Sequence, residues 1–147
     1  MSESAAENIK LATLLHDVGK IGIPEEILLK PGGLTDEEFE MIKKHPLIST
    51  EILKSIAFPK EVICAIRHHH ERLDGKGYPH GLSKDEIPRE ALIIEIVDAY
   101  GAMTKDRPYR KALTKEEASK ELKNGAGTQF DPEVVSAFLK VLKKEKA

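Results

Sequence analysis

The sequence predicts an all-α fold, and three observations support this. Apolar residues recur at intervals of three and four along most of the chain, which is the spacing of one helix face. Thr35 with Glu38, and Thr114 with Glu117, have the spacing of capping boxes, which mark the first turn of a helix. No segment shows the alternation of apolar and polar residues that is typical of a half-buried strand. We therefore expect a helical bundle.

Glycine, proline and capping residues set the expected boundaries of each helix. The first three expected helices are an apolar segment Ile9–Leu15 stopped by Gly19, a short helix from Pro24 to Leu29, and a helix from Thr35 that ends or restarts at Pro46 and continues to Ile56. The others begin at Pro59, Pro88, Thr114 and Asp131. The turn-rich segment Glu71–Ile87 separates two of them, and a loop of that length in a compact domain is usually functional or disordered.

Length and composition limit the class of protein. With 147 residues and a net charge of −2, we expect a single domain over residues 1–147 and no DNA partner. No apolar run approaches the roughly 20 residues of a membrane span, and Met1–Asn8 is too short and polar for a signal peptide. The lone Cys64 excludes an intrachain disulfide, and its place in the apolar run Val62–Ile66 predicts a small core residue. These features favour a cytoplasmic protein without membrane contact.

Histidine and aspartate side chains in apolar settings are the candidate functional residues. They are His16, Asp17, His45, His69, His70 and Asp98. Taken alone, His16-Asp17 is a common helix end, and His45 is a hydrogen-bonded histidine beside a proline. His69 and His70 are harder to dismiss, because both continue the apolar stripe of their helix and need acceptors or a metal ion. Asp98 follows an apolar run in which an unpaired carboxylate would be costly, although a capping or salt-bridge role is also open.

The combined set indicates hydrolytic metal chemistry. Histidine and aspartate without cysteine suit hard or borderline cations rather than a structural zinc site. Two cations about 3.5–4 Å apart, bridged by one carboxylate, are a common device for phosphoester cleavage. Lys20, one helical turn past His16, is placed to neutralise a phosphate oxygen, and a solvated lysine is the alternative. Arg107 and Arg110 follow the helix that carries Asp98, so we expect them to overhang the site, since arginine suits phosphate and stacks on bases.

Several motifs in order resemble one known family. They are His16-Asp17-Val18-Gly19-Lys20, His45-Pro46, His69-His70-Glu71-Arg72-Leu73-Asp74-Gly75-Lys76-Gly77-Tyr78-Pro79, Asp98-Ala99-Tyr100, Asp106-Arg107-Pro108-Tyr109-Arg110 and Gly127-Thr128-Gln129-Phe130-Asp131-Pro132. From about Ile9 onward, the chain resembles the HD-GYP branch of the HD-domain metal-dependent phosphohydrolases. The resemblance implies an HD-domain-like helical bundle in bacterial signalling. It also implies hydrolysis of cyclic di-GMP to linear pGpG or GMP with two or three iron or manganese ions.

Residue roles follow from the same resemblance. It implies that all six histidine and aspartate candidates are metal ligands, with Asp17 as the bridging carboxylate and Lys20 beside the scissile phosphate. The loop Gly75–Pro79, with Gly75, Gly77 and Tyr78, would shape the substrate pocket and offer a contact for a signalling protein. Arg107 and Arg110 would hold the phosphates or guanines.

Two departures from the family pattern lower the expected activity. The chain begins downstream of a helix that usually supplies a further histidine, and Gly101 stands where the family usually has an aspartate. We therefore expect an exposed apolar face at Leu11–Leu15, self-association or reduced stability, and slow hydrolysis. The alternatives are a non-catalytic module that binds the nucleotide or a partner, and a phosphohydrolase acting on another nucleotide. Metal identity and number, the product, the oligomeric state and any input domain stay open.

Overall fold

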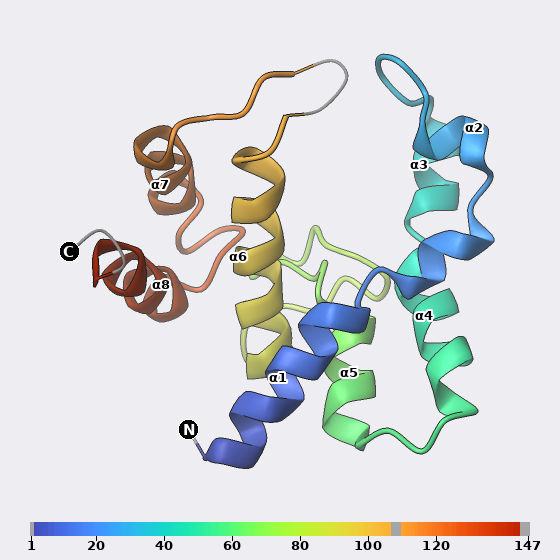
Figure 1. Ribbon diagram of the computed structural model, residues 1–147, viewed down its shortest axis with the longest axis horizontal. Helices are drawn as coiled ribbons and strands as arrows, with labels where there is room; N and C mark the ends of the chain where they lie inside the picture. The colour runs from blue at the N-terminus through green and yellow to red at the C-terminus, as the bar shows by residue number, and fades with distance from the viewer. Residues whose placement is uncertain (1, 107–109, 145–147) are drawn as a thin grey trace.

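The computed structural model describes residues 2–106 and 110–144. These ranges contain helices and connecting turns, without any β-strand and with isolated β-bridges such as that between Asp74 and Ser83. The predicted all-α fold is therefore confirmed. Figure 1 shows α6 in the middle of the molecule, with α7 and α8 on one side and α1 and α5 on the other, while α2, α3 and α4 form the far edge.

The eight α-helices of the described ranges follow the expected order. They are α1 (Glu3–Leu15), α2 (Glu25–Leu28), α3 (Asp36–Ile42), α4 (His45–Lys54), α5 (Lys60–His68), α6 (Arg89–Met103), α7 (Lys115–Asn124) and α8 (Pro132–Lys144). Two short 3-10 helices, η1 (Val18–Gly22) and η2 (Lys84–Glu86), lie in the connections.

Capping residues account for several of these boundaries. Thr35 and Thr114 both form complete capping boxes, as predicted, so α3 and α7 begin one residue later. The start of the first helix is earlier than predicted, because the Ser2 side chain accepts a hydrogen bond from the N–H of Ala5 and caps α1 at Glu3.

The core is built around α5 and α6. Helix α5 packs against α1, α4 and α6, and α6 also packs against α7 and α8. Val62 and Ile66 of α5 meet Ala12, Leu53 and Ile94 in one fully buried cluster. Each large aliphatic side chain buried in this way contributes about 1.5–3 kcal/mol of stability. This packing fixes the C-terminal end of α5 and the middle of α6, where three of the six candidate ligands lie.

A second cluster covers the opposite side of α6. Ile96 packs there with Leu122 of α7, Val135 of α8 and Phe130 from the connecting loop. Ile94 and Ile96 therefore point into different clusters, which explains why the sequence of α6 is apolar on most sides. A helix held from two sides is a rigid support for the side chains that it projects.

The prediction that Cys64 is a core residue is wrong. Cys64 is exposed, and its sulfur lies 3.6 Å from Nδ1 of His68 on the outer side of α5. The buried residues of this helix are Val62, Ala65 and Ile66. An unbroken apolar run does not show which of its members face inward, and the helical period places Cys64 on the side of α5 opposite the buried residues.

The expected exposed face at Leu11–Leu15 is also largely wrong. Leu11 and Leu15 pack against the core cluster, and Ala12 is fully buried within it. Leu14, by contrast, is 74% exposed. The contact of α1 with α5 and α6 covers most of this segment, so one leucine rather than a continuous face reaches the surface.

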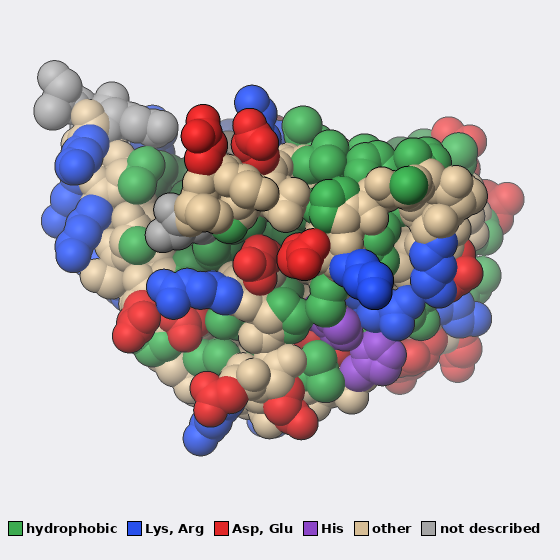
Figure 2. All heavy atoms as spheres, turned by 90° about the horizontal axis from the view of Figure 1, so that it is seen from below, with side chains coloured by type: hydrophobic (Ala, Val, Ile, Leu, Met, Phe, Trp, Pro, Cys, Tyr) green, Lys and Arg blue, Asp and Glu red, His purple; other side chains and the backbone are tan. Residues whose placement is uncertain are grey.

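The surface carries charges of both signs. In Figure 2, acidic and basic side chains are interspersed with hydrophobic ones, and histidine side chains also reach the surface. This mixture agrees with the small net charge of −2. Within the described part of the chain, every helix is too short or too polar to cross a membrane.

Candidate metal centre

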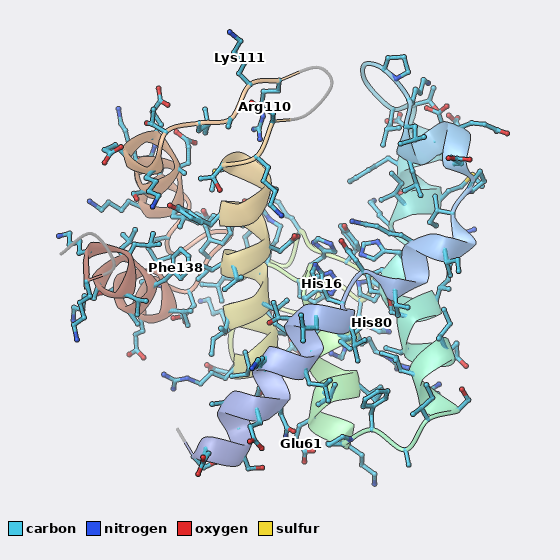
Figure 3. The ribbon with its side chains drawn as sticks, viewed as in Figure 1. His16, Glu61, His80, Arg110, Lys111 and Phe138 are labelled. Atoms are coloured by element: carbon cyan, nitrogen blue, oxygen red, sulfur yellow. The ribbon has the colours of Figure 1, made fainter. Side chains whose placement is uncertain are left out.

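The six candidate ligands come from separate elements and converge at one place. His16 follows α1, Asp17 precedes η1, His45 begins α4, His69 and His70 follow α5, and Asp98 lies inside α6. Figure 3 shows His16 at the end of α1, in the central region between α6 and α4. We call these six residues the His/Asp cluster. The expectation that the six side chains lie close together agrees with the distances between them.

Two carboxylates link the imidazoles at short range. Nε2 of His16 lies 3.5 Å from Oδ1 of Asp98 and 3.6 Å from Oδ2 of Asp17. Nε2 of His45 lies 3.4 Å from Oδ1 of Asp17. Asp17 thus reaches two histidines from different helices, which is the position that a bridging carboxylate needs.

The rings of His69 and His70 complete the cluster. The centroid of the His69 ring lies 4.9 Å from that of His16, 5.4 Å from that of His45 and 4.0 Å from that of His70. His69 and His45 are almost completely buried. His69 is therefore at the centre of the His/Asp cluster, and the other histidines surround it.

Three of the histidines are oriented in the same way. Nδ1 of His16, His45 and His69 each lies 2.6–2.8 Å from the backbone carbonyl oxygen of the residue three positions earlier. A nitrogen facing a carbonyl must carry the proton and donate it, so Nε2 keeps its lone pair. The Nε2 atoms of all three, together with Oδ1 of Asp17, are buried and without a hydrogen-bond partner within the described ranges. Buried polar atoms are rarely left unpaired, so this set fits a cation.

Burial also sets the charge of the histidines. It lowers the pKa of His69 to about 4 and that of His70 to about 2, and the neighbouring imidazoles add to the effect. Burial lowers the pKa of His16 as well, but the nearby carboxylates of Asp98 and Asp17 more than offset this, so the pKa lies above its ordinary value. At neutral pH, His69 and His70 are neutral, which is the form that binds a metal ion.

Two overlapping groups of side chains have the spacing of a metal site. His45, His69 and His70 offer one ligand atom each within 4.8 Å of one another, and so do His16, Asp17 and His69. Because both groups contain His69, they form one continuous site. Imidazole nitrogen and carboxylate oxygen without a thiolate suit iron, manganese or zinc in a catalytic rather than a structural role.

Comparison with known proteins identifies the family of this chain. A family model described as HD domain matches residues 1–134. The chain belongs to the HD domain family. The resemblance that the motifs predicted is thereby confirmed.

Curated relatives of this HD domain are named as phosphodiesterases of cyclic dinucleotides. A "Cyclic di-GMP phosphodiesterase" of Thermotoga maritima is 47% identical over 98% of this chain and 40% of its own length. The "Cyclic di-GMP phosphodiesterase response regulator RpfG" of Xanthomonas campestris is 42% identical over 95% of this chain and 38% of its own length. A "3'3'-cGAMP-specific phosphodiesterase 2" of Vibrio cholerae is 38% identical over 95% and 27%. The HD domain therefore spans less than half the length of these relatives.

Solved structures support the fold. An "HDG"Y"P protein from Bdellovibrio bacteriovorus" matches 97% of the HD domain and 45% of its own chain, with a TM-score of 0.77 and 23% sequence identity. A cyclic GMP-AMP specific phosphodiesterase of Vibrio cholerae matches with a TM-score of 0.74 and 16% identity over 97% of this chain and 39% of its own. At these identities the likeness concerns the fold alone.

Lys20 lies beside the His/Asp cluster. Its Nζ is 2.6 Å from Oδ2 of Asp17, and both side chains are about two-fifths exposed. The ammonium thus pairs with the carboxylate that reaches His16 and His45. The role of Lys20 at a phosphate stays a prediction, and its position next to Asp17 is compatible with that role.

Only one of the two arginines that were expected over the site, Arg110, lies in the described part of the chain. Arg107 lies outside the described residues. Arg110 donates a hydrogen bond of 2.8 Å to the carbonyl of Ala102, near the C-terminal end of α6, and Figure 3 shows it well away from His16. The described contact of Arg110 therefore caps a helix end, and its contact with a substrate stays a prediction.

Glu71 holds the Gly75–Pro79 loop, a role that the sequence reasoning missed. Its carboxylate is buried and accepts hydrogen bonds from the backbone N–H groups of His80 (2.8 Å) and Leu82 (2.9 Å). This draws the loop back over the end of α5, where the Tyr78 ring stacks on the His70 ring with centroids 4.8 Å apart. The sequence contains a signal for this role, because a charged residue directly after two buried histidines needs hydrogen-bond donors of its own.

Close backbone contacts also fix the turn between α1 and η1. The N–H of Gly19 donates to Oγ of Ser49, whose hydroxyl donates to the carbonyl of His16. A Cβ at Gly19 would lie 2.1 Å from the carbonyl oxygen of His45, so only glycine fits. Ser49 is a buried residue of α4 that no sequence pattern marks, and it ties two parts of the cluster together.

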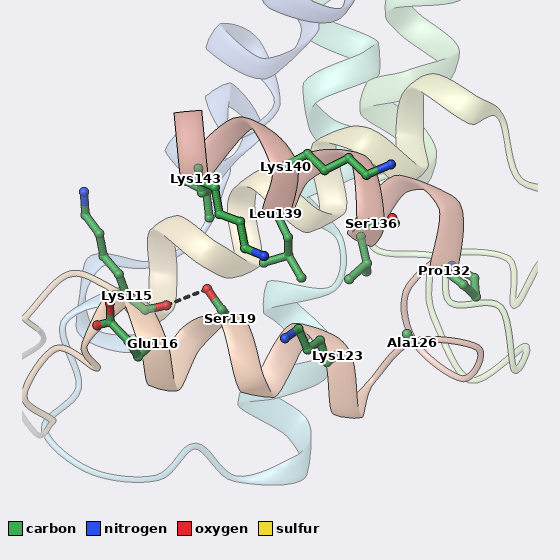
Figure 4. A pocket seen from close by; sticks show the side chains of 12 residues that line it. Lys115, Glu116, Ser119, Lys123, Ala126, Pro132, Ser136, Leu139, Lys140 and Lys143 are labelled. Carbon is green, nitrogen blue, oxygen red and sulfur yellow. Dashed lines mark hydrogen bonds between the residues drawn. The ribbon is translucent and has the colours of Figure 1, made fainter. Parts of the chain in front are cut away.

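A large hollow elsewhere in the molecule is separate from this site. It lies between α7 and α8, has a volume of about 660 Å³, and none of the six cluster residues lines it. Figure 4 shows lysine side chains on both of these helices around it. The candidate site is therefore defined by its buried ligand atoms and not by the size of a cavity.

Proposed function

We propose that this HD domain is a metal-dependent phosphodiesterase that hydrolyses cyclic di-GMP to linear pGpG or GMP. The observation that carries the proposal is the set of buried, unpartnered atoms: Nε2 of His16, His45 and His69, and Oδ1 of Asp17. The names of the relatives add the substrate class, because several are cyclic di-GMP phosphodiesterases at 41–47% identity.

We propose that the His/Asp cluster holds two or three divalent cations, iron or manganese. The residues present fit such ions by donor type and protonation, since neutral imidazoles and carboxylates converge there. Bound divalent cations supply Lewis-acid polarisation of the phosphodiester and a water of lowered pKa. Asp17 would orient His16 and His45 toward a shared position. The Lys20 ammonium would give up part of its ion pair with Asp17 and neutralise a phosphate oxygen of the substrate.

The Gly75–Pro79 loop forms the wall of the site in this proposal. Glu71 holds the loop, and Tyr78 covers His70. Water exclusion at the histidine face strengthens the electrostatic interactions there. We further propose that the outer side of this loop, where Lys76 is exposed, contacts a signalling protein. A cytoplasmic location, a single domain over residues 1–147 and self-association stay predictions.

A related substrate is the second candidate. Relatives named as 3'3'-cGAMP-specific phosphodiesterases are 37–44% identical to this chain, which is close to the range of the cyclic di-GMP enzymes. The two substrates differ in one base only. Discrimination between them therefore depends on groups that contact the base rather than on the His/Asp cluster.

A non-catalytic binding module is the third candidate. Gly101 favours it, because it lies on α6 one turn after Asp98 where the family usually has an aspartate. A side chain at this position would have open space within 4 Å. The absent carboxylate would reduce the positioning of water or substrate without disturbing the fold.

A direct assay separates these candidates. Protein purified without oxygen and loaded with Fe²⁺ or Mn²⁺ is mixed with cyclic di-GMP or 3'3'-cGAMP, and the linear products are separated by chromatography. We expect cyclic di-GMP turnover that is lost in His69→Ala and kept in His68→Ala, a matched control for the neighbouring histidine outside the cluster. Binding without any product in the metal-loaded protein would establish the non-catalytic module instead.

A further inference from the structure

An aromatic side chain at the surface lies next to the loop that covers the His/Asp cluster. Phe39 of α3 is 43% exposed, and its ring meets the Tyr78 ring edge to face, with centroids 6.3 Å apart and planes inclined by 83°. Tyr78 in turn stacks on His70. Three rings therefore lead from the buried histidines to the surface, and Phe39 is the outermost of them.

The surroundings of Phe39 have the chemistry of a base-binding surface. Helix α3 packs mainly against the short helix α2, so the ring is left partly open rather than enclosed. The ammonium of Lys43, one turn further along, lies over one face of the ring, 4.9 Å from its centroid, and pairs with Glu40 at 2.6 Å. A partly exposed aromatic ring with a cation over one face suits a purine stacked on the part that stays open, since bases stack on aromatic rings and lysine donates to O6 and N7 of guanine.

We propose that Phe39 and Lys43 form a guanine-binding platform at the edge of the metal centre. Phe39 receives one guanine of the nucleotide by stacking, and Lys43 favours guanine over adenine, whose N6 amino group is a donor where guanine has an acceptor. The proposal rests on the proposed function in that the guanine belongs to a cyclic dinucleotide. The platform adds the residues that bind the base and distinguish guanine from adenine.

The absence of tryptophan from the chain makes a direct test simple. Phe39→Trp places a single indole at the platform, and a stacked guanine quenches indole fluorescence. The matched control is Met41→Trp on the same helix, because Met41 is 37% exposed and lies about 200° around α3 from Phe39. Cyclic di-GMP is added to each manganese-loaded protein by stopped flow, so that the signal precedes turnover.

We expect quenching by cyclic di-GMP in Phe39→Trp and none in Met41→Trp. Phe39→Ala should weaken the affinity for cyclic di-GMP by about 5- to 150-fold, the range found when a stacking aromatic is removed, while Met41→Ala leaves it unchanged. In Lys43→Met, the preference for cyclic di-GMP over cyclic di-AMP should fall about tenfold or more. Far-ultraviolet circular dichroism establishes that each variant is folded.

The outcomes separate this proposal from the proposed function. Normal cyclic di-GMP hydrolysis with unaltered KM in Phe39→Ala, and equal signals from the two tryptophan variants, would overturn the platform and leave the activity intact. Quenching in Phe39→Trp alone, in a protein that forms no linear product, would support the platform and overturn the activity.

Discussion

Five residues of the His/Asp cluster lie at helix ends, whereas Asp98 lies inside a continuous helix. His16 follows α1, and His69 and His70 follow α5, while Asp17 and His45 stand at the starts of η1 and α4. The last carbonyl groups of a helix have no partner within it. Those of Thr13, Ile42 and Ile66 accept the Nδ1–H of the three histidines that follow them.

The contrast between helix-end and mid-helix residues indicates how an all-helical chain can position metal ligands. A helix end orients an imidazole, because a free carbonyl fixes the ring and leaves Nε2 pointing into the site. In the middle of a helix, the backbone groups are already hydrogen-bonded within the helix. Asp98 therefore depends on its partner His16 for the orientation of its carboxylate, while α6 fixes the position of its backbone.

Replacing the helix-end carboxylate should cost more bound metal than replacing the mid-helix one. Asp17 approaches His16 and His45, whereas the described contact of Asp98 is with His16. We expect Asp17→Asn to lose most of the bound Mn²⁺ and Asp98→Asn to keep a larger share, as measured by metal analysis after dialysis. Equal losses in the two variants would show that position along the helix does not matter.

The turn between α1 and η1 should tolerate no added methyl group. A Cβ at Gly19 would lie 2.1 Å from the carbonyl oxygen of His45 and 2.4 Å from the backbone nitrogen of Ser49. Because the obstacles are backbone atoms, we expect Gly19→Ala to destabilise the protein by about 3 kcal/mol or more in urea unfolding. A loss below about 1 kcal/mol would mean that the turn can shift and that the ligands at helix ends are not rigidly placed.

Helix α6 carries a buried carboxyl group whose protonation should affect stability. Burial raises the pKa of Glu95 to about 8, although a hydrogen bond from Gln129 and the charge of Arg72 act in the opposite direction. The folded state therefore holds a proton that the unfolded chain releases near its ordinary pKa of 4.5. Since the folded state binds more protons, this group makes stability fall as the pH rises from about 4.5 to about 8.

Glu95→Gln should remove that dependence. We expect the variant to gain on the order of 1 kcal/mol or more over the parent at pH values of about 8 and almost nothing near pH 5, measured by chemical denaturation at each pH. Parallel stability curves for the two proteins across this range would contradict the assignment of a neutral carboxyl group.

The smallest expected effect concerns Gly101 in the last turn of α6. A Cβ at Gly101 meets nothing within 4 Å, and glycine inside a helix costs about 1 kcal/mol relative to alanine. Gly101→Ala should therefore raise the stability by about 0.5–1 kcal/mol, in contrast to the loss at Gly19. Thermal unfolding of the two variants side by side checks this, and a loss of stability in Gly101→Ala would show an unrecognised close contact at that position.

Sequence patterns were a good guide to the helices and to the cluster, because both depend on local rules. Capping boxes at Thr35 and Thr114 placed two helix starts, and costly polar groups in apolar stripes marked His69 and His70. Contacts between segments that are far apart in the sequence could not be predicted from such local rules. The clamp of Glu71 on the backbone of residues 80 and 82, and the bridge of Ser49 to the α1–η1 turn, exist only once the chain has folded.

Burial within an apolar run was the least predictable feature. Cys64 stands among apolar neighbours and yet faces outward, since the rotation of α5 is set by its contacts with α1, α4 and α6. Phe39 stands between the charged residues Glu38 and Glu40, and its ring is also left partly exposed, because α3 packs mainly against the short helix α2. Such positions need the packing of neighbouring helices, which the local pattern does not contain.

A count of bound ions tests directly whether the His/Asp cluster binds divalent cations through the helix-end histidines. Metal-free protein is equilibrated with Mn²⁺, and bound and free ions are counted by electron paramagnetic resonance. We predict about two tightly bound ions per chain in the parent protein, with the bound number unchanged in His68→Ala and greatly reduced in His69→Ala. Absence of tight binding in the parent protein, or equal binding in His69→Ala, would mean that this cluster is not a metal site.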